Sequence, residues 1–202
     1  IAGTGIGRNW AHVNSVDYDP TDDSIIISSR HQSAIVKIGR DKKIKWIFAS
    51  PEGWRDGWKN LLLTPVKDGK PIAILDLVVA KSGSETATLF AQKHLDMGIA
   101  SITAGMDQPP LAEMKYSRAV IYRIDQDKKT IEQVWEYGKD RGFKWYSPVT
   151  SLTKYFADKD SIMVYSATAG MGRRPSELKP GEKAGQASPF IEEFKWGEKD
   201  PS

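Results

Sequence analysis

Histidine, asparagine and arginine residues that could bind an anion lie near the start of the sequence. His12 and Asn14 are two residues apart, and Arg30 directly follows the apolar segment 24–29. Residues two apart on a strand share a face, so His12 and Asn14 are expected to line one polar pocket. A guanidinium at the end of a strand can bind an oxyanion through two hydrogen bonds.

Thr150, in the segment 146–151, adds a fourth candidate because it occupies the repeat position of Asn14. We expect the four side chains to converge at one mouth of an array of sheets. A structural interpretation also exists for each one. His12 could bond a neighbouring sheet, Arg30 could form a surface ion pair of little energetic weight, and Thr150 could be an ordinary strand residue.

Short strands separated by polar turns are the elements that must position these side chains. The segments 10–17, 24–29, 34–38 and 44–48 predict a four-stranded antiparallel meander, the unit of a β-propeller blade. The pattern of 34–46 recurs at 119–135, and that of 14–27 recurs at 150–164. Such recurrence indicates repeated supersecondary units.

The sequence therefore predicts an all-β fold in which residues 1–202 form part of a single β-propeller domain. Two to three blades are visible, whereas a closed propeller needs at least about four, so the chain is expected to be part of a larger propeller. Two stretches fit poorly. Residues 71–105 break the repeat and are not expected to form a well-packed blade, and residues 171–188 read as a loop or insertion.

Composition narrows the chemistry. The chain has no cysteine, so thiol nucleophiles and cysteine-based metal sites are excluded. Its net charge is only +3 with acids and bases interspersed, which argues against a nucleic-acid partner, and no apolar run could span a membrane. Nucleotide-binding, nucleophile-elbow and zinc-protease motifs are missing from the sequence, and we expect no metal and no cofactor.

Several motifs, in order along the chain, resemble the bacterial aryl-sulfate sulfotransferases of the arylsulfotransferase family. Together they cover residues 8–67 and about 106–196, which is most of the chain. The motifs are the segments 10–18, 23–30, 114–119, 146–151 and 165–172.

The resemblance implies that this chain is a C-terminal piece of a six-bladed periplasmic propeller that is a homodimer when complete. An enzyme of this type needs no nucleotide donor, because an aryl sulfate passes its sulfuryl group to a histidine and a phenol then takes it. His12 and Arg30 match catalytic positions of the family, and Asn14 and Thr150 match substrate-binding positions.

One family motif is missing. The sulfurylated histidine is expected between Val66 and Gly105, in a Trp-rich motif that ends Thr-Gln-His-Thr, but this stretch contains no Trp and its single histidine is His94. We therefore do not assign the nucleophilic role to His94. The sequence does not decide whether this chain is an active enzyme. The alternative hypothesis is a non-catalytic β-propeller module that binds a protein or a small anion, because a fold alone does not fix a function.

Overall fold

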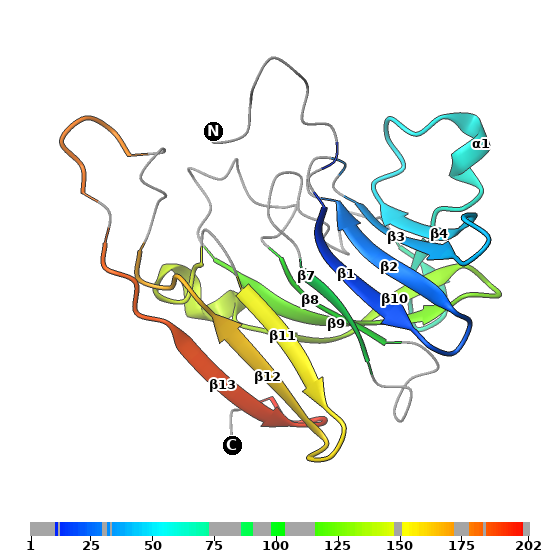
Figure 1. Ribbon diagram of the computed structural model, residues 1–202. Coiled ribbons are helices and arrows are strands. Elements are labelled where there is room, and N and C mark those ends of the chain that lie inside the picture. The colour runs from blue at the N-terminus through cyan, green and yellow to red at the C-terminus, as the bar shows by residue number, and fades with distance from the viewer. Residues whose placement is uncertain are drawn as a thin grey trace.

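The computed structural model describes residues 11, 13–29, 32, 34–72, 86–90, 98–103, 116–147, 151–171, 178–183 and 185–199. These residues form three sheets that follow one another along the chain, with very little helix (Figure 1). All strand pairings between named strands are antiparallel except the short parallel pairing of β5 with β10. The all-β prediction is confirmed at this level. The described strands close no ring, so the propeller stays a prediction.

The first sheet is a four-stranded meander near the start of the chain, drawn blue to cyan in Figure 1. Each strand is joined to the next by a short connection, as the sequence predicts, and the register pairs residues 24–29 of the second strand with 34–39 of the third. The four strands are β1 (Val13–Asp19), β2 (Ser24–Ser29), β3 (Ala34–Gly39) and β4 (Ile44–Ala49).

The second sheet has six strands, in the order β6-β5-β10-β9-β8-β7. Its four-stranded antiparallel part runs from β7 to β10 in chain order, and β5 and β6 add an outer edge after the helix α1 (Asp56–Lys59). The strands are β5 (Thr64–Lys67), β6 (Lys70–Pro71), β7 (Thr86–Phe90), β8 (Gly98–Thr103), β9 (Arg118–Asp125) and β10 (Thr130–Tyr137).

The third sheet is a three-stranded antiparallel meander near the end of the chain. It follows a 3-10 helix at Lys139–Lys144 and consists of β11 (Ser151–Phe156), β12 (Ser161–Ser166) and β13 (Phe190–Lys195). Between β12 and β13, the described residues 167–171, 178–183 and 185–189 belong to no strand or helix. The prediction of a loop or insertion over the whole of 171–188 stays a prediction, since part of that range lies outside the described residues.

The strands β7 and β8 lie within residues 71–105, the stretch that the sequence predicts to form no well-packed blade. These strands pair with each other, and β8 pairs with β9, in a continuous antiparallel register. Residues that favour strands occur in both, namely Thr and Phe in β7 and Ile and Thr in β8. The other residues of 73–105 lie outside the described part of the chain, and the side-chain packing of this segment is left as predicted.

Hydrophobic side chains hold the three sheets together as layers. One core cluster joins Ile26, Ile35 and Phe48 of the first sheet to Val120 and Tyr122 of the second. A second cluster joins β9 to the third sheet through side chains that include Ile121, Val164 and Phe194. Because β9 alternates its side chains between the two clusters, the second sheet is covered on both faces. β7, an edge strand of the second sheet, lies next to β1 of the first sheet and β11 of the third.

The predicted repeats agree with the structure in their turns. Asp23 and Asp160 both adopt a left-handed backbone conformation, with φ of 51° and 52°. Each accepts a hydrogen bond from a tyrosine five residues earlier, from Tyr18 at 3.1 Å and from Tyr155 at 2.5 Å. Burial, followed by this hydrogen bond, raises the pKa of Tyr155 to about 12. Aspartate tolerates positive φ, so the same residue type closes both turns.

Candidate functional site

The four predicted site residues lie at the edge of what the structure describes. Asn14 belongs to β1, but only its backbone is described, and His12, Arg30 and Thr150 lie outside the described residues, as do His31 and His94. Their assignment to one site therefore stays a prediction. The residues beside them are described, and these show where the chain enters and leaves the sheets.

The strand register places Asn14 in an irregularity of β1, and its equivalence with Thr150, which lies outside the described residues, stays a prediction. A β-bulge between Val13 and Ser15 inserts one residue into β1, so Val13 lies opposite Ser29. In the third sheet, Ser151 lies opposite Ser166. Asn14 is therefore the extra residue of the bulge. A bulge re-aims the side chains around it and often occurs next to active sites, which repeat matching in the sequence could not detect.

Hydrogen bonds join segments from three of the family-like motifs at one end of the sheets, which we call the motif end. This end comprises Ser29, Ser117, Arg118, Ser147 and Thr168. The Ser117 hydroxyl accepts a hydrogen bond from the Ser147 amide at 3.0 Å. The Ser147 hydroxyl in turn accepts one from the Thr168 amide at 3.0 Å and lies 2.7 Å from the Thr168 hydroxyl. The start of β9, the segment before β11 and the turn after β12 are thus fixed together.

The start of β1 and the end of β2 complete the motif end. The Ser29 hydroxyl donates to the Ala11 carbonyl oxygen at 2.9 Å, which fixes the segment leading to His12 against the residue before Arg30. β1, β9 and β11 all begin at this end, and β2 and β12 finish there. In the sequence, His12 and Thr150 directly precede β1 and β11, and Arg30 directly follows β2.

Arg118 is the most buried charged side chain at the motif end, with 2% exposure. Its NH1 group donates to Gln133 at 3.1 Å and forms an ion pair with Glu136. Its Nε and NH2 groups have no hydrogen-bond partner among the described residues. A buried donor without an acceptor is costly, so this side chain calls for an explanation.

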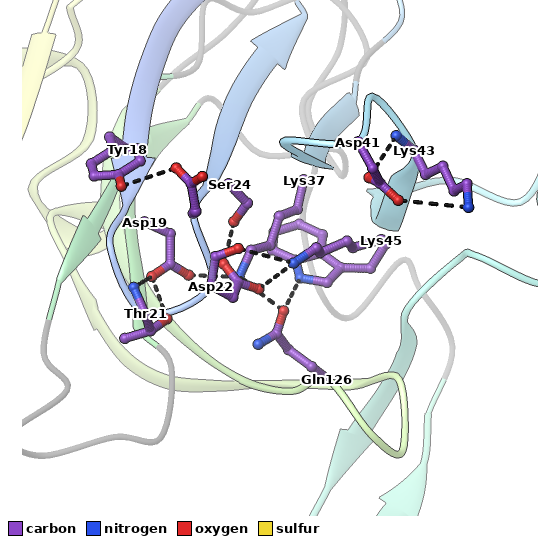
Figure 2. A network of polar contacts seen from close by, with 12 residues as sticks. Tyr18, Asp19, Thr21, Asp22, Ser24, Lys37, Asp41, Lys43, Lys45 and Gln126 are labelled. Atoms are coloured by element: carbon purple, nitrogen blue, oxygen red, sulfur yellow. Dashed lines mark hydrogen bonds and ion pairs between the residues drawn. The ribbon is translucent and has the colours of Figure 1, made fainter.

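The opposite end of the first two sheets carries a saturated polar network, which we call the turn end (Figure 2). The Lys37 ammonium, fully buried, contacts Asp19 at 2.6 Å, Asp22 at 3.0 Å and Gln126 at 2.9 Å. An ammonium has three N–H donors, and here three acceptors surround it. Gln126 also accepts from the Trp46 indole at 3.1 Å, and so joins the β9–β10 turn to the first sheet.

The carboxylates of the turn end are held in the charged form. Burial alone would raise the pKa of Asp22, but hydrogen bonds from Lys45, Ser24 and Lys37 lower it to about 2. Burial acts the same way on Asp19, and hydrogen bonds from Lys37 and Thr21 lower its pKa. Both shifts follow from contacts to groups of this network, so the turn end has a complete structural role.

A cluster of polar side chains around the Arg141–Glu192 ion pair joins the second and third sheets. Arg141 forms an ion pair with Glu192, and its NH1 donates to the Tyr137 hydroxyl at 2.6 Å. Glu192 also accepts from the Trp145 indole at 2.9 Å, and the Arg141 guanidinium lies 5.9 Å from the Trp145 ring centroid. Burial and the hydrogen bond to Glu192 raise the pKa of Tyr137. An open hollow of about 600 Å³ adjoins this group, lined by residues 136–141 and Lys199.

Metal and membrane sites can be judged only for the described part of the chain. There, no group of three His, Cys, Asp or Glu side chains could hold a metal ion. Within the same residues, no helix has the length and apolar character to cross a bilayer.

Arg118 belongs to the motif segment 114–119 but is not among the site residues that the sequence predicts. The available signal was a charge placed at the head of the apolar strand 119–122, where it must be buried along with its neighbours. Lys37, within the apolar segment 34–38, carries the same signal and proves to be saturated. The two residues differ in whether their N–H donors have hydrogen-bond acceptors among the described residues.

The amino-acid sequence is similar to a known protein family and to two named relatives. The model of the arylsulfotransferase (ASST) family matches residues 1–202. The chain is 45% identical over 174 residues to the arylsulfate sulfotransferase AssT of Escherichia coli O6:H1 and 41% identical over 177 residues to the AssT of Lelliottia amnigena. These matches cover 82% and 84% of this chain but 29% of each relative, so the chain spans less than a third of their length.

Proposed function

Because the chain belongs to the arylsulfotransferase family, we propose that the protein containing it transfers a sulfuryl group from a phenolic sulfate ester to a phenol. The family match along residues 1–202 carries this proposal. The names of the two relatives also specify aryl sulfates as substrates of those proteins. The convergence of motif segments at the motif end supports a shared site there.

The proposed reaction has two displacement steps. In the first, an imidazole nitrogen attacks sulfur, the bond from sulfur to the aryl oxygen breaks, and the leaving phenoxide takes a proton. In the second, a phenol oxygen attacks sulfur, the nitrogen–sulfur bond breaks, and a base takes the phenol proton. Histidine suits such chemistry because it is a nucleophile and titrates near neutral pH. We assign the proton transfers to His12 and leave the nucleophilic histidine unassigned.

The other predicted residues would stabilise charge. Sulfuryl transfer resembles phosphoryl transfer, in which positioning and electrostatics provide most of the catalysis. We propose that Arg30 and Asn14 bind the equatorial sulfuryl oxygens and that Thr150 binds substrate. The proposed scaffold is a β-propeller whose blades include the three sheets. The contacts of β7 with both β1 and β11 support this arrangement. We further propose a periplasmic homodimer for the complete protein.

Intact-protein mass spectrometry tests the proposal. The chain is incubated with 4-nitrophenyl sulfate, quenched at alkaline pH and weighed, and release of 4-nitrophenol is followed by absorbance. A gain of one SO₃ group that disappears on adding phenol, with formation of phenyl sulfate, is the expected result. His12→Gln should slow transfer by on the order of a hundredfold or more, as loss of a general acid–base does.

His31→Gln is the matched control, because His31 has no assigned role and should transfer at the wild-type rate. Release of 4-nitrophenol without a protein adduct would contradict the histidine intermediate and favour direct transfer from the donor to the acceptor. Binding of the aryl sulfate with neither adduct nor phenol release would favour the non-catalytic binding module. Binding without transfer is a relevant outcome because the Trp-rich motif is missing between Val66 and Gly105.

A further inference from the structure

The side chain of Arg118 enters the layer between the first and second sheets at the motif end. Strand alternation places Arg118 on the same face of β9 as Val120 and Tyr122, both of which belong to the core shared with the first sheet. The start of β9 is held in place by hydrogen bonds between Ser117, the residue before Arg118, and Ser147. The guanidinium is thus held by a rigid strand and not by a loop.

One edge of this guanidinium is occupied and the other is not. Gln133 and Glu136 hold NH1, and both come from β10, the strand paired with β9. The Nε and NH2 groups form the opposite edge, and neither has an acceptor among the described residues. This edge presents two nearly parallel N–H donors, the geometry that binds two oxygens of a carboxylate or a tetrahedral oxyanion.

Lys37 shows that this fold satisfies a buried cation where the cation is only structural. Its acceptors come from both sheets, and the burial of Lys37 is complete. Arg118 has comparable burial in the same layer, but among the described residues its acceptors come only from its own sheet. Gln133 and Glu136 hold NH1, so Nε and NH2 are two buried donors held in a fixed orientation, as in preorganised anion sites.

We propose that Arg118 is an oxyanion-binding residue whose Nε and NH2 groups donate to two oxygens of a sulfuryl or sulfate group. This inference rests on the proposed function, because the sulfate ester identifies the oxyanion. Arg118 would be a substrate-binding residue in addition to Arg30. The ligand could be the sulfate ester or free sulfate, because both present the oxygens of a tetrahedral sulfur oxyanion.

Calorimetric titration with inorganic sulfate, against sodium chloride of matched ionic strength, tests the proposal on the 202-residue chain. Saturable sulfate binding is expected. Arg118→Gln should weaken it at least about tenfold, and Arg118→Lys should weaken it less, because a point charge replaces the fork. Arg123→Gln is the matched control on the same strand, since Arg123 is 49% exposed and pairs with Glu132 at 3.4 Å. It should bind sulfate as the wild type does.

Several results would overturn the assignment. These are no saturable binding by the wild type, equal affinity in Arg118→Gln, or failure of both Arg118 variants to fold, which would make the residue structural. A steady-state assay separates this inference from the proposed function. If Arg118→Lys leaves the donor KM unchanged while transfer proceeds, the inference alone fails. If sulfate binds through Arg118 but no transfer occurs, the proposed function alone fails.

Discussion

Lys37 and Arg118 are buried cations at opposite ends of the same pair of sheets, and they differ in how their donors are satisfied. At the turn end, three acceptors surround the Lys37 ammonium, two of them carboxylates (Figure 2). At the motif end, one nitrogen of the Arg118 guanidinium is held and the other two have no acceptor among the described residues. Burial of a charge does not by itself indicate a functional site, and the balance of donors and acceptors is the informative quantity.

The largest expected effect is on the turn end. Lys37→Met should lower the free energy of unfolding by roughly 3 to 5 kcal/mol, because it leaves the fully buried carboxylate of Asp19 without its cation. Denaturant-induced unfolding followed by circular dichroism measures this change. Lys43→Met is the control, since Lys43 is 84% exposed and lies 3.7 Å from Asp41, and it should cost no more than about 0.5 kcal/mol. Equal losses in the two variants would contradict the structural role of Lys37.

The pH dependence of stability provides a smaller effect at the same end. The pKa of Asp22 is lowered in the folded chain from 3.8 to about 2, so its contribution is present above pH 4 and is lost as the pH falls toward 2. Asp22→Asn should remove that part of the acid destabilisation, by at most about 1 kcal/mol because solvent screens the group. Unfolding curves between pH 2 and 6 for both proteins test this. Identical curves would show that the network does not hold Asp22 ionised.

The smallest effect on stability is expected at the motif end. Arg118→Met should change the free energy of unfolding by less than about 1 kcal/mol, because it removes two buried donors that lack acceptors and leaves Glu136 29% exposed and able to meet water. The same denaturant titration, in sulfate-free buffer, measures the change. A loss as large as that of Lys37→Met would show that Arg118 has acceptors in the remaining part of the chain, and the contrast between the two ends would disappear.

The sequence predicted the first sheet and the repeats well because their signals are local. Short apolar segments with β-branched residues and polar turns specify the meander of β1 to β4, and the same pattern specifies β9 with β10 and β11 with β12. The sequence did not specify β7 and β8, because this stretch carries no repeat signal, and β8 gains its pairing from β9. Pairing with a strand formed elsewhere is a tertiary property.

By itself, the sequence determined the fold class, the family and the residue types available for chemistry. The tertiary structure decided the register and the environment of each charge. The bulge between Val13 and Ser15 makes Asn14 an extra residue of β1, and a shift of one residue changes which face a side chain takes. Lys37 and Arg118 look alike in the sequence, since each is a cation in an apolar strand. They differ because, among the described residues, acceptors from a second sheet reach Lys37 and not Arg118, and such contacts arise only when distant segments pack together.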